Sequence, residues 1–176
     1  MATIKLSERA QAIKLLCLDV DGVLTDGSVI LGNNGEEFKA FNIKDGFGLR
    51  ALQKFGLHVA IITGRQSALV QRRADELGIP HVYQGNSDKR GAFAELLKKL
   101  KLSAQQVAYV GDDFPDLPLM GQVGLAVAPN DAHNEIKAAA HWTTQNGGGR
   151  GAVREVCDLI LQAQGHWSAL RSEYEK

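Results

Sequence analysis

Two aspartates one residue apart, Asp19 and Asp21, follow a short apolar run and precede Gly22. At the end of a buried strand this pair would concentrate negative charge. Burying unpaired carboxylates is costly, so a bound cation or a reaction must account for them. The alternative is an Asp-Gly turn that caps the next segment. Because a pattern this short often arises by accident, this motif alone supports both interpretations about equally.

Polar residues also follow two further apolar runs. Thr63 precedes Gly64 and Arg65, so a hydroxyl and backbone amides could hold a phosphoryl oxygen there. Taken alone, these residues more often mark the start of a helix. Lys89 could neutralise phosphate charge, although a lone lysine is usually solvated. Each motif by itself therefore leaves a purely structural interpretation open.

Three acids, Asp112, Asp113 and Asp116, gather after another apolar run. Favourable placement on a helix dipole explains one or two acids at a helix start, but not a third. In an open parallel sheet, ligands bind beyond the carboxyl ends of the strands, and Asp19 and Asp21 would lie at the same edge. Together the motifs favour a site for a cation and a phosphoryl group.

The elements that position these motifs alternate in type along the chain. Continuous apolar runs, typical of strands buried on both faces, lie at residues 14–20, 58–63, 81–85, 106–111 and 124–129. Helical stripes lie around residues 69–77, 93–100 and 153–161. Ser67 is expected to cap the first of these helices, and Gly78 to begin its stop signal. This alternation predicts an α/β fold, a Rossmann-like parallel sheet with helices on both faces.

One segment interrupts the alternation. Residues 27–41 contain two short strand-like pieces around Asn33-Asn34-Gly35, a favourable turn, and predict a β-hairpin flap. The hairpin is too short to be a second domain, so we expect a single domain over residues 1–176 and no cap domain. We expect residues 147–151 to form a flexible loop, and the tail at about 165–176 to be mobile unless a partner holds it.

Composition narrows the class of function. The chain has 176 residues, with 20 Lys and Arg against 20 Asp and Glu, so its formal net charge is zero. A nucleic-acid-binding protein usually carries a basic surplus, which this chain lacks. Cys17 and Cys157 both fall in apolar stretches and suit a reducing compartment. We recognise no signal peptide or membrane-spanning run, so we expect a cytoplasmic location.

The order of the motifs resembles that of the haloacid dehalogenase superfamily. The resemblance implies that Asp19 is the nucleophile that attacks phosphorus, and that Asp21 is first the general acid and then the base. Thr63 and Lys89 would complete the catalytic set. The resemblance also implies a Mg²⁺ cofactor, held by the carboxylates of Asp19 and Asp112 and the backbone carbonyl of Asp21.

In the same comparison, Asp113 and Asp116 would orient these ligands. Dehalogenases lack the second aspartate of the first motif, and ion-pumping ATPases carry Thr there, so Asp21 favours a phosphatase or a phosphomutase. Mutases usually have a sizeable cap that shields the intermediate from water. Because only a hairpin stands in that place here, hydrolysis is favoured.

Longer segments resemble one family within the superfamily, the 3-deoxy-D-manno-octulosonate 8-phosphate phosphatases. The similarity lies in LDVDGVLTDG, FNIKDGFGLRAL, GDDFPDL and GGRGAVRE. It implies a cap-less enzyme that hydrolyses this sugar-acid phosphate through an aspartyl-phosphate intermediate, in lipopolysaccharide precursor synthesis. It also implies a homotetramer whose hairpins join in a central barrel, so that a neighbouring subunit helps to cover each site.

The same resemblance implies a set of substrate contacts. They are Asp21, Asn42, Ile43, Lys44, Asp45, Gly46, Arg50, Arg65, Arg73 and Lys89. For any one of the arginines, solvated surface is about as good an interpretation as substrate contact. One alternative is a nonulosonate 9-phosphate phosphatase acting on a sialic-acid-type sugar, which spacing alone does not distinguish. The other is a non-catalytic regulatory homologue, against which the intact motifs argue.

Overall fold

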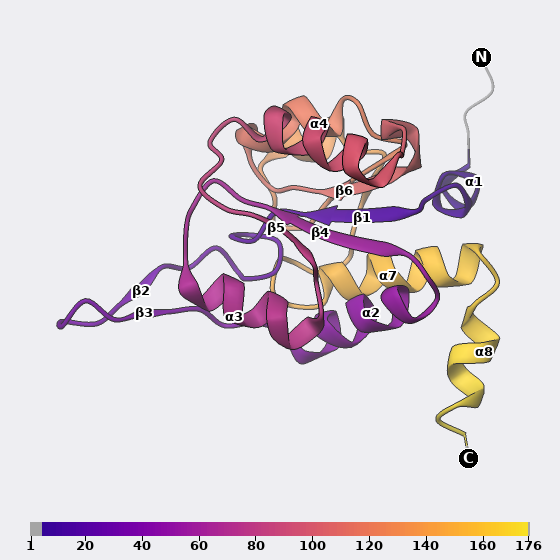
Figure 1. Ribbon diagram of the computed structural model, residues 1–176, viewed down its shortest axis with the longest axis horizontal. Helices are drawn as coiled ribbons and strands as arrows, with labels where there is room; N and C mark the ends of the chain where they lie inside the picture. The colour runs from indigo at the N-terminus through magenta and orange to yellow at the C-terminus, as the bar shows by residue number, and fades with distance from the viewer. Residues whose placement is uncertain (1–4, 176) are drawn as a thin grey trace.

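The computed structural model describes residues 5–175. Its centre is a six-stranded sheet in which every pair of neighbouring strands is parallel (Figure 1). In spatial order the strands are β5 (His81–Tyr83), β4 (His58–Ile62), β1 (Leu15–Leu18), β6 (Val107–Val110), β7 (Leu125–Ala128) and β8 (Trp142–Thr143). The central strands β1, β6 and β7 are buried along their whole length, as continuous apolar runs predict.

Helices cover both faces of this sheet, which confirms the predicted α/β class. One face packs against α1 (Leu6–Gln11), α2 (Ile43–Lys54), α3 (Ala68–Leu77), α7 (Ala152–Ala163) and α8 (Trp167–Ser172). The other face packs against α4 (Lys89–Leu100), α5 (Leu117–Met120) and α6 (Asn134–Ala139). Two 3-10 turns, η1 (Ala104–Gln106) and η2 (Phe114–Asp116), flank β6. Side chains alternate along each strand, so successive residues enter opposite cores.

Local signals explain where the helices begin and end. Ser67 accepts a hydrogen bond from the Leu69 amide at the start of α3, and Gly78 ends that helix with a φ of +67°, both as the sequence predicts. Asp88 caps α4 in the same way, so Lys89 is the first residue of that helix. The predicted helical stripes do not include the 12-residue helix α2, whose sequence contains Gly46 and Gly48, or the short elements α1, α5, α6 and β8.

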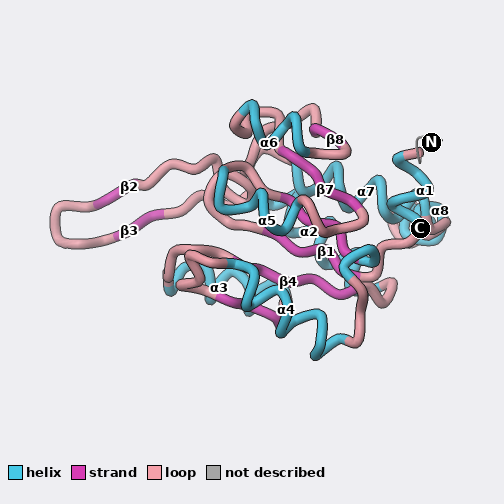
Figure 2. Tube along the Cα trace, turned by 90° about the horizontal axis from the view of Figure 1, so that it is seen from above, coloured by secondary structure: helices cyan, strands magenta, loops and turns pink. Residues whose placement is uncertain are grey.

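The hairpin projects away from the sheet as a separate arm (Figures 1 and 2). Its strands β2 (Ile30–Leu31) and β3 (Glu37–Phe38) pair antiparallel, with Ile30 opposite Phe38, on either side of the predicted turn. We refer to residues 27–41 as the hairpin arm.

Two segments are more ordered than the sequence suggests. The glycine-rich loop 147–151 lies against the segment after β1: a Cβ on Gly148 would collide with the Gly22 carbonyl, and the Gly149 amide bonds the Val23 carbonyl at 2.9 Å. These glycines therefore serve close backbone approach rather than flexibility. Part of the tail forms α8, with Leu170 buried; of the predicted tail, residue 176 lies outside the described residues.

Among the described residues, no helix combines the length and the apolar character needed to cross a membrane.

Candidate active site

The predicted motifs meet at the carboxyl edge of the sheet. Asp19, Thr63 and Asp112 follow the adjacent strands β1, β4 and β6, and Lys89 opens α4. They line a pocket of about 450 Å³. Its lining comprises Asp19, Asp21, Gly27, Thr63, Gly64, Arg65, Ser87, Lys89, Asp112, Asp113, Pro115 and Asp116. The parallel sheet thus brings together all four motifs and every residue predicted to be catalytic or to hold or orient the metal.

Lys89 is a buried cation at the floor of this pocket, with its side chain 2% exposed. Its Nζ lies 2.9 Å from Asp19 Oδ1 and 2.6 Å from Asp116 Oδ1. Burial opposes the charge on Lys89, but the two carboxylates outweigh it and raise the pKa of the ammonium. Lys89 is therefore a fixed positive charge beside Asp19.

Asp116 is held by hydrogen bonds on both of its oxygens. Oδ1 accepts from Lys89 and from the Tyr109 hydroxyl, each at 2.6 Å. Oδ2 accepts from the amides of Asp112 and Asp113, at 2.9 and 3.3 Å. With both oxygens engaged, Asp116 is suited to orienting its neighbours rather than to binding a metal.

Tyr109 is a member of this network that sequence reasoning missed. It lies on β6, is fully buried, and its pKa is raised by burial and by the nearby Asp116. In the sequence it belongs to an apolar strand run. The only signal was that a buried tyrosine hydroxyl usually needs a hydrogen-bond partner.

The acids form a group that a divalent cation fits. One carboxylate oxygen each from Asp19, Asp112 and Asp116 lie within 4.8 Å of one another. Burial, followed by repulsion from neighbouring acids, raises the pKa of Asp19 to about 6 and that of Asp112 to about 7. Asp19 Oδ1 is buried and, despite the nearby ammonium, has no hydrogen-bond partner among residues 5–175. Three carboxylates beside one ammonium leave an oxygen-rich cluster with excess negative charge, which suits Mg²⁺.

Gly22 fixes the distance between the two acidic motifs. Its φ is +86°, which disfavours a side chain, and a Cβ there would collide with the Asp112 carboxylate. Asp112 therefore lies directly against the turn that follows Asp21.

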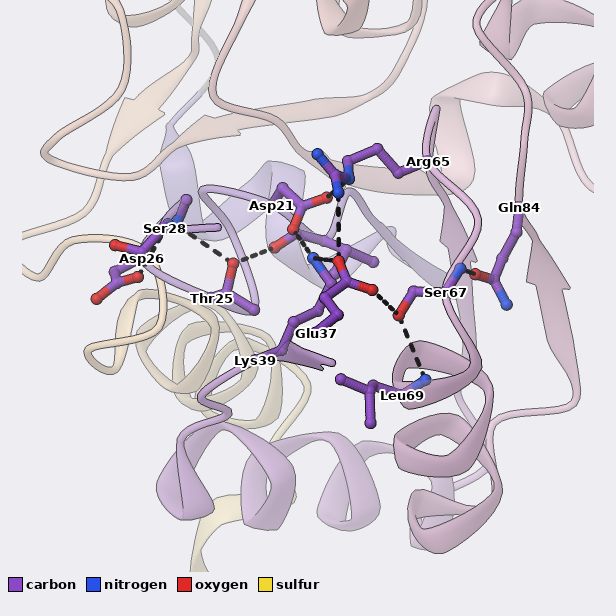
Figure 3. Close-up of polar contacts among 12 residues, drawn as sticks. Asp21, Thr25, Asp26, Ser28, Glu37, Lys39, Arg65, Ser67, Leu69 and Gln84 are labelled. Carbon is purple, nitrogen blue, oxygen red and sulfur yellow. Dashed lines mark hydrogen bonds and ion pairs between the residues drawn. The ribbon is translucent and has the colours of Figure 1, made fainter. Parts of the chain in front are cut away.

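The base of the hairpin arm contributes charges that the sequence did not single out. Lys39 forms an ion pair with Asp21, and its side chain is 1% exposed (Figure 3). Glu37 accepts hydrogen bonds from Arg65 at 3.2 Å and from the Ser67 hydroxyl at 3.1 Å. Arg65 Nε lies 3.8 Å from Asp21 Oδ2. Asp21 thus stands between two cations at the rim of the pocket.

Several predicted substrate contacts lie elsewhere in the chain. Asn42, Ile43 and Lys44 line a separate hollow with Gly149 and Arg150. The side chain of Asn42 caps α2 by accepting from the Lys44 amide at 2.8 Å.

The two remaining arginines also lie outside the pocket. Arg50 lines another hollow, beside Tyr174 of the C-terminal segment. Arg73 lies over the Phe41 ring, with its guanidinium carbon 5.8 Å from the ring centre, and against Gly46, where a Cβ would collide with it. Of the three arginines, the chain itself brings only Arg65 to the pocket.

Asp45 is turned into the protein. It is 1% exposed and accepts a hydrogen bond from the Arg154 amide at 2.8 Å, in the first turn of α7. Burial raises the pKa of Asp45, and this hydrogen bond only partly offsets that rise. In this structure Asp45 caps α7 from a distance and joins it to α2.

Comparison with known proteins places this geometry among phosphatases. A family model described as haloacid dehalogenase-like hydrolase matches residues 79–155. The 3-deoxy-D-manno-octulosonate 8-phosphate phosphatase KdsC of Yersinia pestis is 57% identical over 157 residues, covering 89% of this chain and 84% of the relative. The enzyme of the same name from Escherichia coli K12 is 56% identical over the same shares.

Solved structures agree in fold. The crystal structure of the Yersinia pestis phosphatase superposes with a TM-score of 0.91 at 55% identity, covering 92% of this chain and 87% of that one. The phosphatase from Moraxella catarrhalis, solved with a magnesium ion, a phosphate ion and a KDO molecule, superposes with a TM-score of 0.93 at 45% identity. That match covers 96% of this chain and 97% of the other.

Proposed function

We propose that this chain hydrolyses 3-deoxy-D-manno-octulosonate 8-phosphate to the free sugar acid and inorganic phosphate. The chain belongs to the family of phosphatases named for this substrate. This reaction belongs to lipopolysaccharide precursor synthesis. The observation that carries the proposal is the placement of Asp19 beside the buried Lys89 and the Asp112 carboxylate, on the floor of a pocket of a size suited to a small ligand.

In the first step, an oxygen of the Asp19 carboxylate attacks phosphorus, and the bond from phosphorus to the ester oxygen breaks. Asp21 gives its proton to the departing oxygen, so the sugar leaves as an alcohol. The step leaves an aspartyl phosphate at residue 19 and an ionised carboxylate at residue 21.

In the second step, a water oxygen attacks phosphorus while Asp21 accepts a proton from that water. The bond between phosphorus and the Asp19 oxygen breaks and releases phosphate. Both aspartates return to their starting protonation states. The position of Asp21 at the pocket rim, two residues beyond the nucleophile, supports this pair of roles.

The approach of a carboxylate to a phosphate requires charge compensation. Lys89 supplies one fixed positive charge, and the Thr63 hydroxyl, which is buried at the pocket wall, is suited to a phosphoryl oxygen. Mg²⁺ is the cofactor of the reaction, and when bound it offsets the charge of phosphate and carboxylates. The carboxylates of Asp19 and Asp112 and the backbone carbonyl of Asp21 would hold it, with Asp113 and Asp116 orienting them.

Arg65 is the residue of this chain best placed for the sugar carboxylate. It lines the pocket, and its planar guanidinium can bind a carboxylate through two parallel hydrogen bonds. Arg50 and Arg73 lie outside the pocket of their own chain. We propose that they act across a subunit interface, as do Asn42 and the exposed Ile43 and Lys44, while the buried Asp45 and Gly46 support this segment from within their own chain.

The subunit interface would be formed by the hairpin arms. We propose a homotetramer in the cytoplasm, assembled through the hairpin arms. Exposed apolar side chains on the arm support the assembly: Val29, Ile30, Leu31 and Phe38 are 46–71% exposed. The two buried cysteines, which form no disulfide, support a reducing compartment.

The test is phosphate release with Mg²⁺ from a panel of substrates. We expect kcat/KM for 3-deoxy-D-manno-octulosonate 8-phosphate to exceed that for a nonulosonate 9-phosphate and for a pentose phosphate without a carboxylate by about tenfold or more. A preference for the nonulosonate ester would select that alternative. No turnover of any ester would favour the non-catalytic homologue, which the intact motifs argue against.

The arginine assignment has its own test. Arg65→Ala should cost about 2–4 kcal/mol in the free energy that sets kcat/KM for the sugar acid, but little for p-nitrophenyl phosphate, which has no carboxylate. Arg72→Ala is the matched control, because Arg72 is 79% exposed and its ion pair is with Glu76 on the same helix. Equal losses on both esters with Arg65→Ala would contradict the carboxylate role.

A further inference from the structure

Lys39 is buried at the base of an arm whose other side chains are largely exposed. Its side chain is 1% exposed, whereas its neighbour Phe38 is 55% exposed. Glu37 and Lys39 are two residues apart, so in an extended segment they share a face. That face is turned toward the pocket rim (Figure 3).

Four charged groups alternate in sign on this face. Lys39 pairs with Asp21, Asp21 lies 3.8 Å from Arg65, and Arg65 donates to Glu37 at 3.2 Å. Glu37 Oε1 lies 3.7 Å from Lys39 Nζ and closes the ring. The ring carries no net charge when Asp21 is ionised, as it is between the two steps of the reaction. Its members come from the first motif, the second motif and the hairpin arm.

The burial of Lys39 requires these partners. Removing an ammonium from water costs several kcal/mol unless opposite charges compensate it. Among the described residues, its ion pairs are with Asp21 and Glu37. Separating Lys39 from Asp21 would therefore cost free energy. As a result, the ion pair holds the Asp21 carboxylate toward Lys39.

Asp21 needs such support because its surroundings repel it. Asp19 and Asp112 are carboxylates that line the same pocket as Asp21. A freely rotating carboxylate at position 21 would turn away from this negative floor. The cation that counters this from the arm side is Lys39.

We propose that Lys39 is a positioning residue: it fixes the Asp21 carboxylate for proton transfer to the leaving oxygen, and Glu37 holds it in place. The inference rests on the proposed role of Asp21. It goes beyond that role by making the placement of the hairpin arm a determinant of the chemical step. Movement of the arm displaces Lys39 and with it Asp21.

The test uses the leaving group. p-Nitrophenolate departs without protonation, whereas an alkyl ester needs a proton; a pentose phosphate serves as that ester, because it lacks the carboxylate that Arg65 would bind. Asp21→Asn should therefore lower kcat/KM, which reports the steps up to release of the leaving group and not the later attack of water, by about 10²–10⁴-fold on an alkyl phosphate and much less on p-nitrophenyl phosphate. Lys39→Met should reproduce this split at a smaller size, about tenfold on the alkyl ester and under about threefold on the aryl ester. Lys39→Arg should restore part of the loss.

Controls separate this effect from a change of fold. Glu36→Gln alters the neighbouring hairpin carboxylate, whose hydrogen bonds are to Asn34 at the turn, and should leave both reactions unchanged. If Lys39→Met does not fold, Glu37→Gln keeps the lysine and should give the same split, about threefold on the alkyl ester. Circular dichroism and light scattering check the fold and the assembly.

Two results would overturn the proposal in different ways. Equal losses on both esters with Lys39→Met, beside a clear split with Asp21→Asn, would make Lys39 merely structural. No split with Asp21→Asn would instead remove the acid role of Asp21 from the proposed function, and the positioning role would go with it.

Discussion

The floor of the pocket and the hairpin arm are built in opposite ways. The floor, by which we mean Asp19, Lys89, Tyr109, Asp112 and Asp116, is buried or partly buried in the edge of the sheet and its groups contact one another. The arm has strands of two residues each and exposes its large apolar side chains. An isolated hairpin of this kind is only marginally stable in water.

The difference separates what one chain can do from what it cannot. The floor draws its order from the parallel strands, so its geometry needs no second copy. Of its large apolar side chains, Phe41 at the base packs against the core, whereas Val29, Ile30, Leu31 and Phe38 are exposed. The place of the outer part of the arm therefore depends on another surface and on the charged ring at its base. We therefore expect substitutions in the floor to lower kcat on every ester, and substitutions in the arm to lower kcat/KM mainly on the sugar acid.

The largest expected effect tests the floor directly. Asp19→Asn removes the attacking charge and should lower kcat by about 10⁴-fold or more on every ester, with the assembly intact. Phosphate release with light scattering measures both. Substantial activity without deamidation back to Asp would contradict the aspartyl-phosphate route. Dissociation of the assembly would contradict the prediction that the pocket floor and the subunit interface are independent.

The next effect tests the arm. Leu31→Lys places a charge on a residue that is 71% exposed in one chain, so the fold should change by less than about 0.5 kcal/mol. If four arms join, the same charge is buried several times over and the assembly should dissociate. We then expect kcat/KM to fall by about tenfold on the sugar acid, with little change for p-nitrophenyl phosphate.

Ser7→Lys adds the same charge on an exposed face of α1, at the far end of the sheet from the arm, and is the matched control. It should leave the assembly unchanged. A Leu31→Lys protein that remained a tetramer in light scattering would show that the arm does not carry the interface.

The same contrast explains what the sequence could predict. Asp19, Thr63, Lys89 and Asp112 were identifiable because each follows an apolar strand run, or the turn after one, and parallel strands end at one edge. Their convergence follows from the topology alone. The predicted strand ranges differ from those observed only at their ends, where hydrogen bonding stops before the hydrophobic pattern does.

What the sequence did not predict depends on contacts between distant segments. Lys39 meets Asp21 across 18 positions, and nothing in a hairpin pattern tells which polar side chain will be buried. In the sequence, Tyr109 is indistinguishable from the other residues of an apolar strand run. The tail orders because the His166 ring stacks on Phe55, with 4.6 Å between ring centres, a contact that only the folded chain creates.

A smaller effect is expected inside the floor. Tyr109→Phe removes one donor to the buried Asp116 and should cost about 1–3 kcal/mol in the free energy of unfolding, with only a few-fold loss in kcat because Lys89 and two amides remain. Urea unfolding and steady-state kinetics measure the two. A loss in kcat as large as that of Asp19→Asn would make the hydroxyl part of the chemistry rather than of its support.

The smallest effect concerns pH and the metal. Burial and acid repulsion raise the folded-state pKa of Asp19 to about 6 and of Asp112 to about 7, from an ordinary value of 3.8. The folded chain therefore keeps protons that the unfolded chain has released, so these groups destabilise the chelated protein as pH rises from about 4 to about 7. Because Asp112 is partly exposed, solvent screening weakens its share of this effect.

Mg²⁺ should reverse that loss, because it binds the ionised carboxylates. The gap between urea unfolding curves with Mg²⁺ and with chelator should widen from pH 5 to about pH 7 and then level off, since other acids titrate alike in both. Leu31→Lys should leave this gap unchanged, because the arm stands outside the acidic cluster. A gap that is independent of pH would mean that the metal is held by groups other than these two aspartates.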